Sequence, residues 1–255
     1  MWIRAKQSIS AGDESTNVIA GRDVNILLKG NVPTDLVNQK IEEQVEKLRK
    51  SRPFSDFDQT RSSLSLGRRL AEGELSGGSD EVKGRALAWC ARVLSPSDDL
   101  EWAEKFLELA KHLGNSTEAK IAEAFVVSQK GDRPAALKVL AGIDSDASRS
   151  ASLMIVAHHD GAEGALSWMN DAGYTVGDLD SDGKGFLLSH QLQLGRWNEV
   201  AQTVGALSEA NFDDTPILHH LAALATLVPT IPQDFRTVVL TQVPFDSQEF
   251  PLASD

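Results

Sequence analysis

The sequence predicts a mainly α-helical fold, an α-solenoid of helix pairs preceded by a short β-rich N-terminal segment. Three observations predict it. From residue 54 onward, apolar residues recur with the period of amphipathic helices, and Gly, Pro, Ser and Asp interrupt them at short intervals. Glycines at positions 131, 161 and 195 each close one apolar run before another opens, at spacings of 30 and 34 residues. Residues 1–31 instead lack any helical period.

The two short apolar fragments of residues 1–31 echo each other ten residues apart, each with a β-branched residue followed by a glycine and an Asp. They read as strand and turn, and a hairpin this short needs a covering surface. Either the chain's own helices cover it or copies of the chain pair edge to edge. The second alternative makes this segment an oligomerisation element, with candidate contact residues Ile9, Val18, Ile19, Val24 and Ile26.

Residues 32–53 are expected to form one amphipathic helix after Pro33. Its apolar positions fall on one helical face and are Leu36, Val37, Ile41, Val45 and Leu48. Opposite charges four residues apart, such as Glu43 with Lys47, stabilise an exposed helix slightly. This helix is either a linker or a short parallel coiled coil.

Residues 54–228 form the predicted helical-repeat domain. Helices are expected near 56–73, 79–94, 98–113, 116–130, 133–142, 147–159, 162–172, 182–194, 197–208 and 215–227. Capping side chains stand before several of them, at Ser79, at Ser97 to Asp99 and at Ser116. Glycines 114, 131, 173 and 195 stand where a left-handed residue ends a helix. Residues 229–255 contain four prolines and are read as a separate C-terminal segment without a solenoid cap, as in a piece of a longer protein.

The repeat resembles the tetratricopeptide family of helix pairs. Gly131, Gly161 and Gly195 are each followed by small or apolar pairs, and Ala103 precedes Ala136 by 33 residues. The resemblance implies a right-handed solenoid whose concave face binds a protein or peptide. The sequence departs from the family where glycine is favoured in the first helices, at positions 124, 154 and 188, and no proline closes the units. Residues 12–17 (GDESTN) and 20–26 (AGRDVNI) of the N-terminal segment resemble the Gly/Asn-rich leaders of multidomain bacterial proteins, some of them suspected in defence.

In the resembling family the first helix of each pair lines the concave surface. Aligning the chain on its three glycines places Gln129, His159 and Gln193 at the same position, each two residues before its glycine. Glu118, Ser148 and Asp182 align near the starts of the same helices. The candidate partner-binding groove is therefore Glu118, Gln129, Ser148, His159, Asp182 and Gln193. The alternative is that these are ordinary solvated polar positions.

Other motifs favour structural roles over chemistry. Asp178, Asp180 and Asp182 copy the first half of an EF-hand loop, but position twelve is Ser189, so an acidic loop that caps the next helix is the favoured interpretation over a calcium site. The pairs His158-His159 and His219-His220 are adjacent on helices and cannot easily hold one metal ion, since neighbours point about 100° apart. We expect no metal site, no cofactor and no catalytic residue.

Composition narrows the function further. The chain has 255 residues and a net charge of −12, which disfavours nucleic acid and anionic membranes as partners. No apolar run approaches the length of a spanning helix, and the single cysteine, Cys90, lies among apolar neighbours and reads as a buried core residue. We expect a soluble cytoplasmic protein, a non-enzymatic scaffold or sensor that binds a protein or peptide and self-associates. The alternative is the regulatory N-terminal region of a larger effector enzyme.

Overall fold

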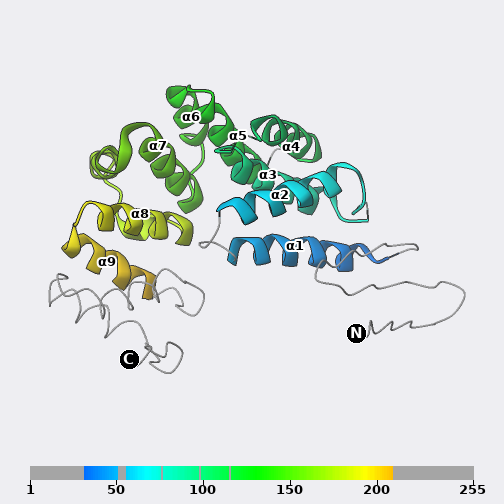
Figure 1. Ribbon diagram of the computed structural model, residues 1–255, viewed down its shortest axis with the longest axis horizontal. Coiled ribbons are helices and arrows are strands. Elements are labelled where there is room, and N and C mark those ends of the chain that lie inside the picture. Colours follow the sequence, from blue (N-terminus) through cyan, green and yellow to red (C-terminus); the bar gives the residue numbers. More distant parts are fainter. Residues whose placement is uncertain (1–31, 51–55, 76, 98, 115, 209–255) are drawn as a thin grey trace, which may run out of the picture. The chain divides into compact units, whose positions relative to one another are not determined.

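The computed structural model describes residues 32–50, 56–75, 77–97, 99–114 and 116–208. Within these residues the secondary structure is helical, so the predicted mainly α-helical fold is confirmed (Figure 1). The predicted β-rich segment 1–31, the helix 215–227 and the segment 229–255 lie outside the described residues. No described helix has the length and apolarity needed to cross a bilayer. The chain divides into two compact units, which are treated separately below.

The first unit contains four helices: α1 (Thr34–Lys50), α2 (Asp56–Ala71), α3 (Asp80–Leu94) and α4 (Leu100–Leu113). All four were expected, and their ends agree with the predicted ranges within three residues. Helix α3 packs against α4 and is the most buried of the four, as expected for a helix that is apolar on most of its faces.

Helix α1 packs within the first unit through two of the five residues of its predicted apolar face. Val37 and Ile41 are buried and approach Gly77 and Gly78 in the turn before α3. The Ser79 amide donates to Asn38 Oδ1 at 2.8 Å, which ties the same turn to α1. Leu36, in contrast, stays half exposed. The part of the α1 face that a coiled coil would use is thus partly covered by the chain itself.

The second unit begins within α5 (Thr117–Gln129) and continues with α6 (Arg133–Leu140) and α7 (Asp146–Asp171). A short 3-10 helix, η1 (Val176–Asp178), then leads to α8 (Ser181–Gln193) and α9 (Trp197–Ser208). Helices α6 and α7, α7 and α8, and α8 and α9 pack as consecutive neighbours.

Glycines mark the junctions between consecutive helices of the second unit. Gly131 between α5 and α6 has φ 88°, and Gly195 between α8 and α9 has φ 68°. Gly161 has φ 73° and ψ −174°, so α7 consists of two helices joined at a kink, in agreement with the two helices expected near 147–159 and 162–172. Residues other than glycine rarely adopt these backbone angles. The predicted left-handed cap at Gly114 is wrong, because its φ of 160° and ψ of 124° are extended.

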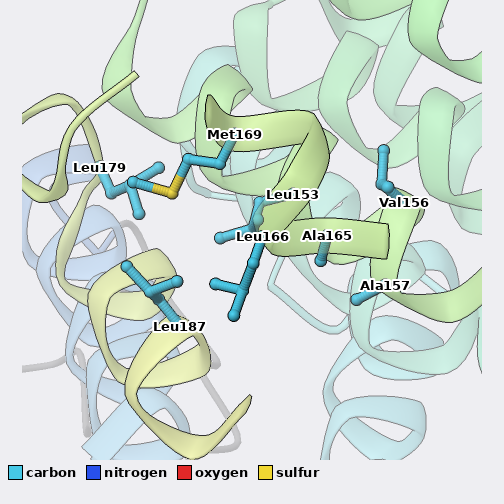
Figure 2. Packing of buried hydrophobic residues seen from close by; sticks show 8 residues of the cluster. All are labelled: Leu153, Val156, Ala157, Ala165, Leu166, Met169, Leu179 and Leu187. Atoms are coloured by element: carbon cyan, nitrogen blue, oxygen red, sulfur yellow. The ribbon is translucent and has the colours of Figure 1, made fainter. Parts of the chain in front are cut away.

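Two apolar clusters lie in the described part of the second unit. The first joins α5, α6 and the start of α7 and contains Ile121, Ala124, Ala136, Leu140, Ala151 and Ile155. The second joins α7 to η1 and α8, and Figure 2 shows Leu153, Leu166 and Met169 of α7 lying toward Leu179 and Leu187. Because the two clusters lie on different parts of α7, this helix ties its neighbours on both sides into one unit.

Close approach of α7 and α8 depends on a glycine that the sequence analysis did not single out. A Cβ added at Gly183 would lie 2.6 Å from Ser150 Cβ, which is inside any normal contact distance. The Ser150 hydroxyl also accepts the Asp180 amide at 3.1 Å. The small residues at this crossing thus allow the two backbones to come together.

Capping side chains explain most helix starts. The hydroxyls of Ser79 and Ser116 accept the amides of Val82 and Ala119 at 3.3 and 3.2 Å, as predicted. Among the capping residues expected at 97–99, Asp99 makes no side-chain cap, and residue 98 lies outside the described residues. The Ser97 hydroxyl instead donates to the Leu94 carbonyl at 2.7 Å and accepts the Asp99 amide at 3.2 Å, so it stabilises the turn rather than the helix start.

Candidate functional site

The structure places two of the six predicted groove residues in one polar cluster. Gln129 lies at the end of α5, and His159 lies in α7 just before the kink at Gly161. Three interactions join the residues around them. Ser128 Oγ lies 3.0 Å from His159 Nε2, Gln129 Nε2 lies 3.5 Å from His158 Nε2, and Arg133 pairs with Asp160 at 2.6 Å. We call these residues the turn cluster: Ser128, Gln129, Arg133, His158, His159 and Asp160.

The turn cluster exists because two glycine junctions lie against each other. Its α5 and α6 residues flank Gly131, and its α7 residues directly precede Gly161. The adjacent imidazoles of His158 and His159 stand edge to face with centroids 5.1 Å apart, so each reaches a different residue of α5. This divergence is the expected geometry of neighbouring residues on a helix.

The chemistry of the turn cluster is that of a hydrogen-bonding surface. His158, His159 and Asp160 are exposed, and Gln129 is half-buried. Ser128 is 2% exposed, so its hydroxyl anchors the His159 ring from beneath. Ser128 and His159 make the kind of contact that a nucleophile and its general base share, but Asp160, the carboxylate next to His159, is paired with Arg133 instead of with the ring.

The other four predicted groove residues lie elsewhere. Glu118 is exposed in the first turn of α5, in the part of that helix grouped with the first unit. Asp182 is half-buried in the first turn of α8, and Gln193 is exposed at the end of the same helix.

Ser148 has an internal role that the sequence analysis missed. It is 2% exposed, and its hydroxyl donates to the carbonyls of Ile143 and Ser145 at the start of α7. A side chain committed to backbone groups in this way is not presented to a ligand at the surface, so placing it in a groove is a misreading of a helix start.

The alignment on glycines did not select the other four members of the turn cluster. Ser128 and His158 each lie three residues before a junction glycine, so the alignment on glycines that selected Gln129 and His159 would have found them one position earlier. The Arg133–Asp160 ion pair carries no such signal, because it joins positions that are not equivalent in the repeat.

The acidic loop before α8 uses its carboxylates locally. Asp178 Oδ2 accepts the Thr175 amide and hydroxyl, both at 2.7 Å, and these hydrogen bonds hold the pKa of Asp178 below its usual value. Asp180 Oδ1 accepts the Gly183 amide at 2.8 Å and caps α8, as the capping interpretation expected of a residue in this loop. In the described part of the chain no three His, Cys, Asp or Glu side chains gather as metal ligands would.

Cys90 is fully buried in α3, which confirms the prediction that it is a small core residue. Burial raises the pKa of its thiol to about 12, because the thiolate loses its hydration in an apolar environment. The thiol therefore stays protonated and inert in the folded chain.

Comparison with protein-family models, with curated proteins and with solved structures found no significant match.

Proposed function

We propose that this protein is a non-enzymatic scaffold or sensor, a tetratricopeptide-like solenoid of helix pairs that binds a protein or peptide. The observation that supports it most is the recurrence of one junction. Gly131, Gly161 and Gly195 each join two helices through a left-handed residue, at spacings of 30 and 34 residues. Stacked helix pairs of this length build an extended surface rather than a closed pocket.

The turn cluster is the part of that surface proposed to contact the partner. Imidazole, amide and carboxylate groups at one edge supply both donors and acceptors for a peptide backbone. They are carried by α5 and α7, which belong to one apolar cluster, so the polar groups are held on rigid elements.

Site-specific photo-crosslinking tests this role. A photoreactive amino acid at Gln129 should give a discrete adduct with one protein in an extract of the native host, whereas the same probe at Ser167, an exposed position beyond the kink of α7, should not. The substitutions His158→Ala and His159→Ala should weaken binding of the purified partner identified in this way. Equal adducts at both positions, or none at Gln129, would contradict the proposal.

The proposal includes a cytoplasmic location and self-association through residues 1–31. Light scattering of the full chain should show an oligomer. Replacing Ile19 and Val24 with Asp should dissociate it, because charged side chains cannot be buried between paired strands without a partner. A monomeric wild-type chain would remove the self-association part and leave the binding part standing.

A further inference from the structure

Two side-chain cations in the first unit converge on one tryptophan. The guanidinium carbon of Arg68, on α2, lies 4.3 Å from the centroid of the Trp102 ring, and the Lys105 ammonium of α4 lies 4.6 Å from it. The indole is half-buried, while both cationic side chains are exposed. The electron-rich face of the ring attracts both cations and holds them in place.

Neither cation forms an ion pair with a carboxylate of the described residues. The next residue on α2 shows the contrast, because Arg69 pairs with Glu74 at 2.9 Å, whereas the interaction found for Arg68 and for Lys105 in this part of the chain is with the ring. Like charges held against the same ring repel each other, and an anion placed beside them lowers that repulsion. Unpaired cations stand out in a chain with 25 basic and 37 acidic residues.

We propose that Arg68, Trp102 and Lys105 form a docking site for a short acidic segment of a partner protein. Carboxylates of that segment would pair with the two cations, whose positions the indole has already fixed, so little side-chain entropy is lost on binding. This inference rests on the proposed role in protein binding and names the chemistry of a partner. It does not depend on the turn cluster, which lies on other helices.

The number of cations favours an acidic peptide over nucleic acid. Proteins that grip DNA commonly neutralise several phosphates at once. Here two cations are available, and exposed Glu101 and Glu108 flank them on α4. The chain's net charge of −12 also repels a long polyanion. A segment with one or two carboxylates meets the two cations without bringing further negative charge against α4.

Fluorescence anisotropy on the full chain tests the inference. The probe is a fluorescein-labelled hexapeptide that alternates Glu and Gly, and its counterpart with Gln is the neutral control. We expect the acidic peptide alone to bind, more weakly as salt is raised. The double substitution Arg68→Gln and Lys105→Gln should weaken binding by about tenfold, because each exposed ion pair contributes up to about fivefold. Lys138→Gln, at an exposed position of α6, removes one charge elsewhere and should leave binding unchanged.

Three results would overturn the inference. The first is that the wild-type chain does not bind the acidic peptide at low salt. The second is that the double variant binds the peptide as tightly as the wild type does. The third is that a single-stranded oligonucleotide binds this site more tightly than the peptide. Circular dichroism and the urea midpoint verify that each variant is folded. We expect the double variant to fold, because the Arg68 and Lys105 side chains are exposed. If the peptide binds but Gln129 gives no crosslink, only the proposed role of the turn cluster is refuted. If Gln129 gives a crosslink but the peptide does not bind, only this docking site is refuted.

Discussion

Replacing Gly67 with Ala should destabilise the first unit, because the added methyl group meets a buried ring. Gly67 lies on α2 and faces Phe106 of α4, whose side chain is 0% exposed. A Cβ at this position would lie 2.5 Å from Phe106 Cζ and 2.7 Å from Cδ2. Ordinary contacts between carbon atoms are about 3.5 to 4.0 Å, so the ring or a helix must move by about 1 Å.

Two effects of opposite sign determine the magnitude. Gly to Ala inside a helix is favourable by up to about 1 kcal/mol, whereas overpacking a close-packed core typically costs about 1 to 3 kcal/mol. A rigid, fully enclosed ring places this site near the upper end of that range. We therefore expect a net loss of about 2 kcal/mol in the free energy of unfolding. It should appear as a lower urea midpoint at unchanged slope.

A matched substitution and a double variant make the test decisive. Gly84 of α3 is also a buried helical glycine, but a Cβ there would lie 3.4 Å from Leu113 Cβ and 3.5 Å from the Ala110 carbonyl oxygen, both ordinary contacts. Gly84→Ala should be neutral or stabilising. The double variant Gly67→Ala with Phe106→Leu should lose less stability than the sum of the losses of the two single variants, because the smaller Leu side chain makes room for the added methyl group. A Gly67→Ala protein as stable as the Gly84→Ala protein would refute the packing of α2 on Phe106.

Further predictions concern groups whose environment the structure defines. Asp178→Asn should lower the free energy of unfolding at pH 7. It should leave the free energy of unfolding unchanged at a pH below the pKa of Asp178 in the folded chain. That pKa is depressed by the Thr175 hydrogen bonds, so the contribution is present above the unfolded value of about 3.9 and is lost on acidification, as urea titrations at pH 7 and about pH 2 would show. Cys90 should resist a thiol reagent at pH 7 until denaturant is added, because its thiol is buried and its pKa is about 12; rapid labelling of the folded chain would contradict this. Thr203→Val should cost about 1 to 3 kcal/mol, because it leaves the buried side-chain oxygen Oε1 of Gln191, now bonded to the Thr203 hydroxyl at 2.8 Å, without that donor. Unchanged stability would show that water replaces the hydroxyl.

The helices of this chain were predictable because their signals are local. Apolar period, capping serines and junction glycines lie within a few residues of the ends they define, and the α7 kink at Gly161 was expected from the same signals. Ser97, Asp99 and Gly114 were misjudged where two local conformations suit the same sequence. Ser97 serves a turn rather than a cap, and Gly114 is extended rather than left-handed.

Two of the six residues of the turn cluster were selected from the sequence. Alignment on glycines found Gln129 and His159, because equivalent positions of a repeat fall at equivalent places in space. It also selected Ser148, which is buried against the backbone of its own helix start. Residue type alone does not separate a surface serine from a capping one.

The sequence by itself determined where helices begin, end and break, because those events depend on the conformational preferences of a few neighbouring residues. Only the tertiary structure decided which side chains meet: His159 with Ser128, Arg133 with Asp160, and Arg68 with Trp102. Each of these contacts joins two helices. Its existence depends on how closely the helices pack, which glycines such as Gly183 and buried rings such as Phe106 set through contacts that no local pattern records.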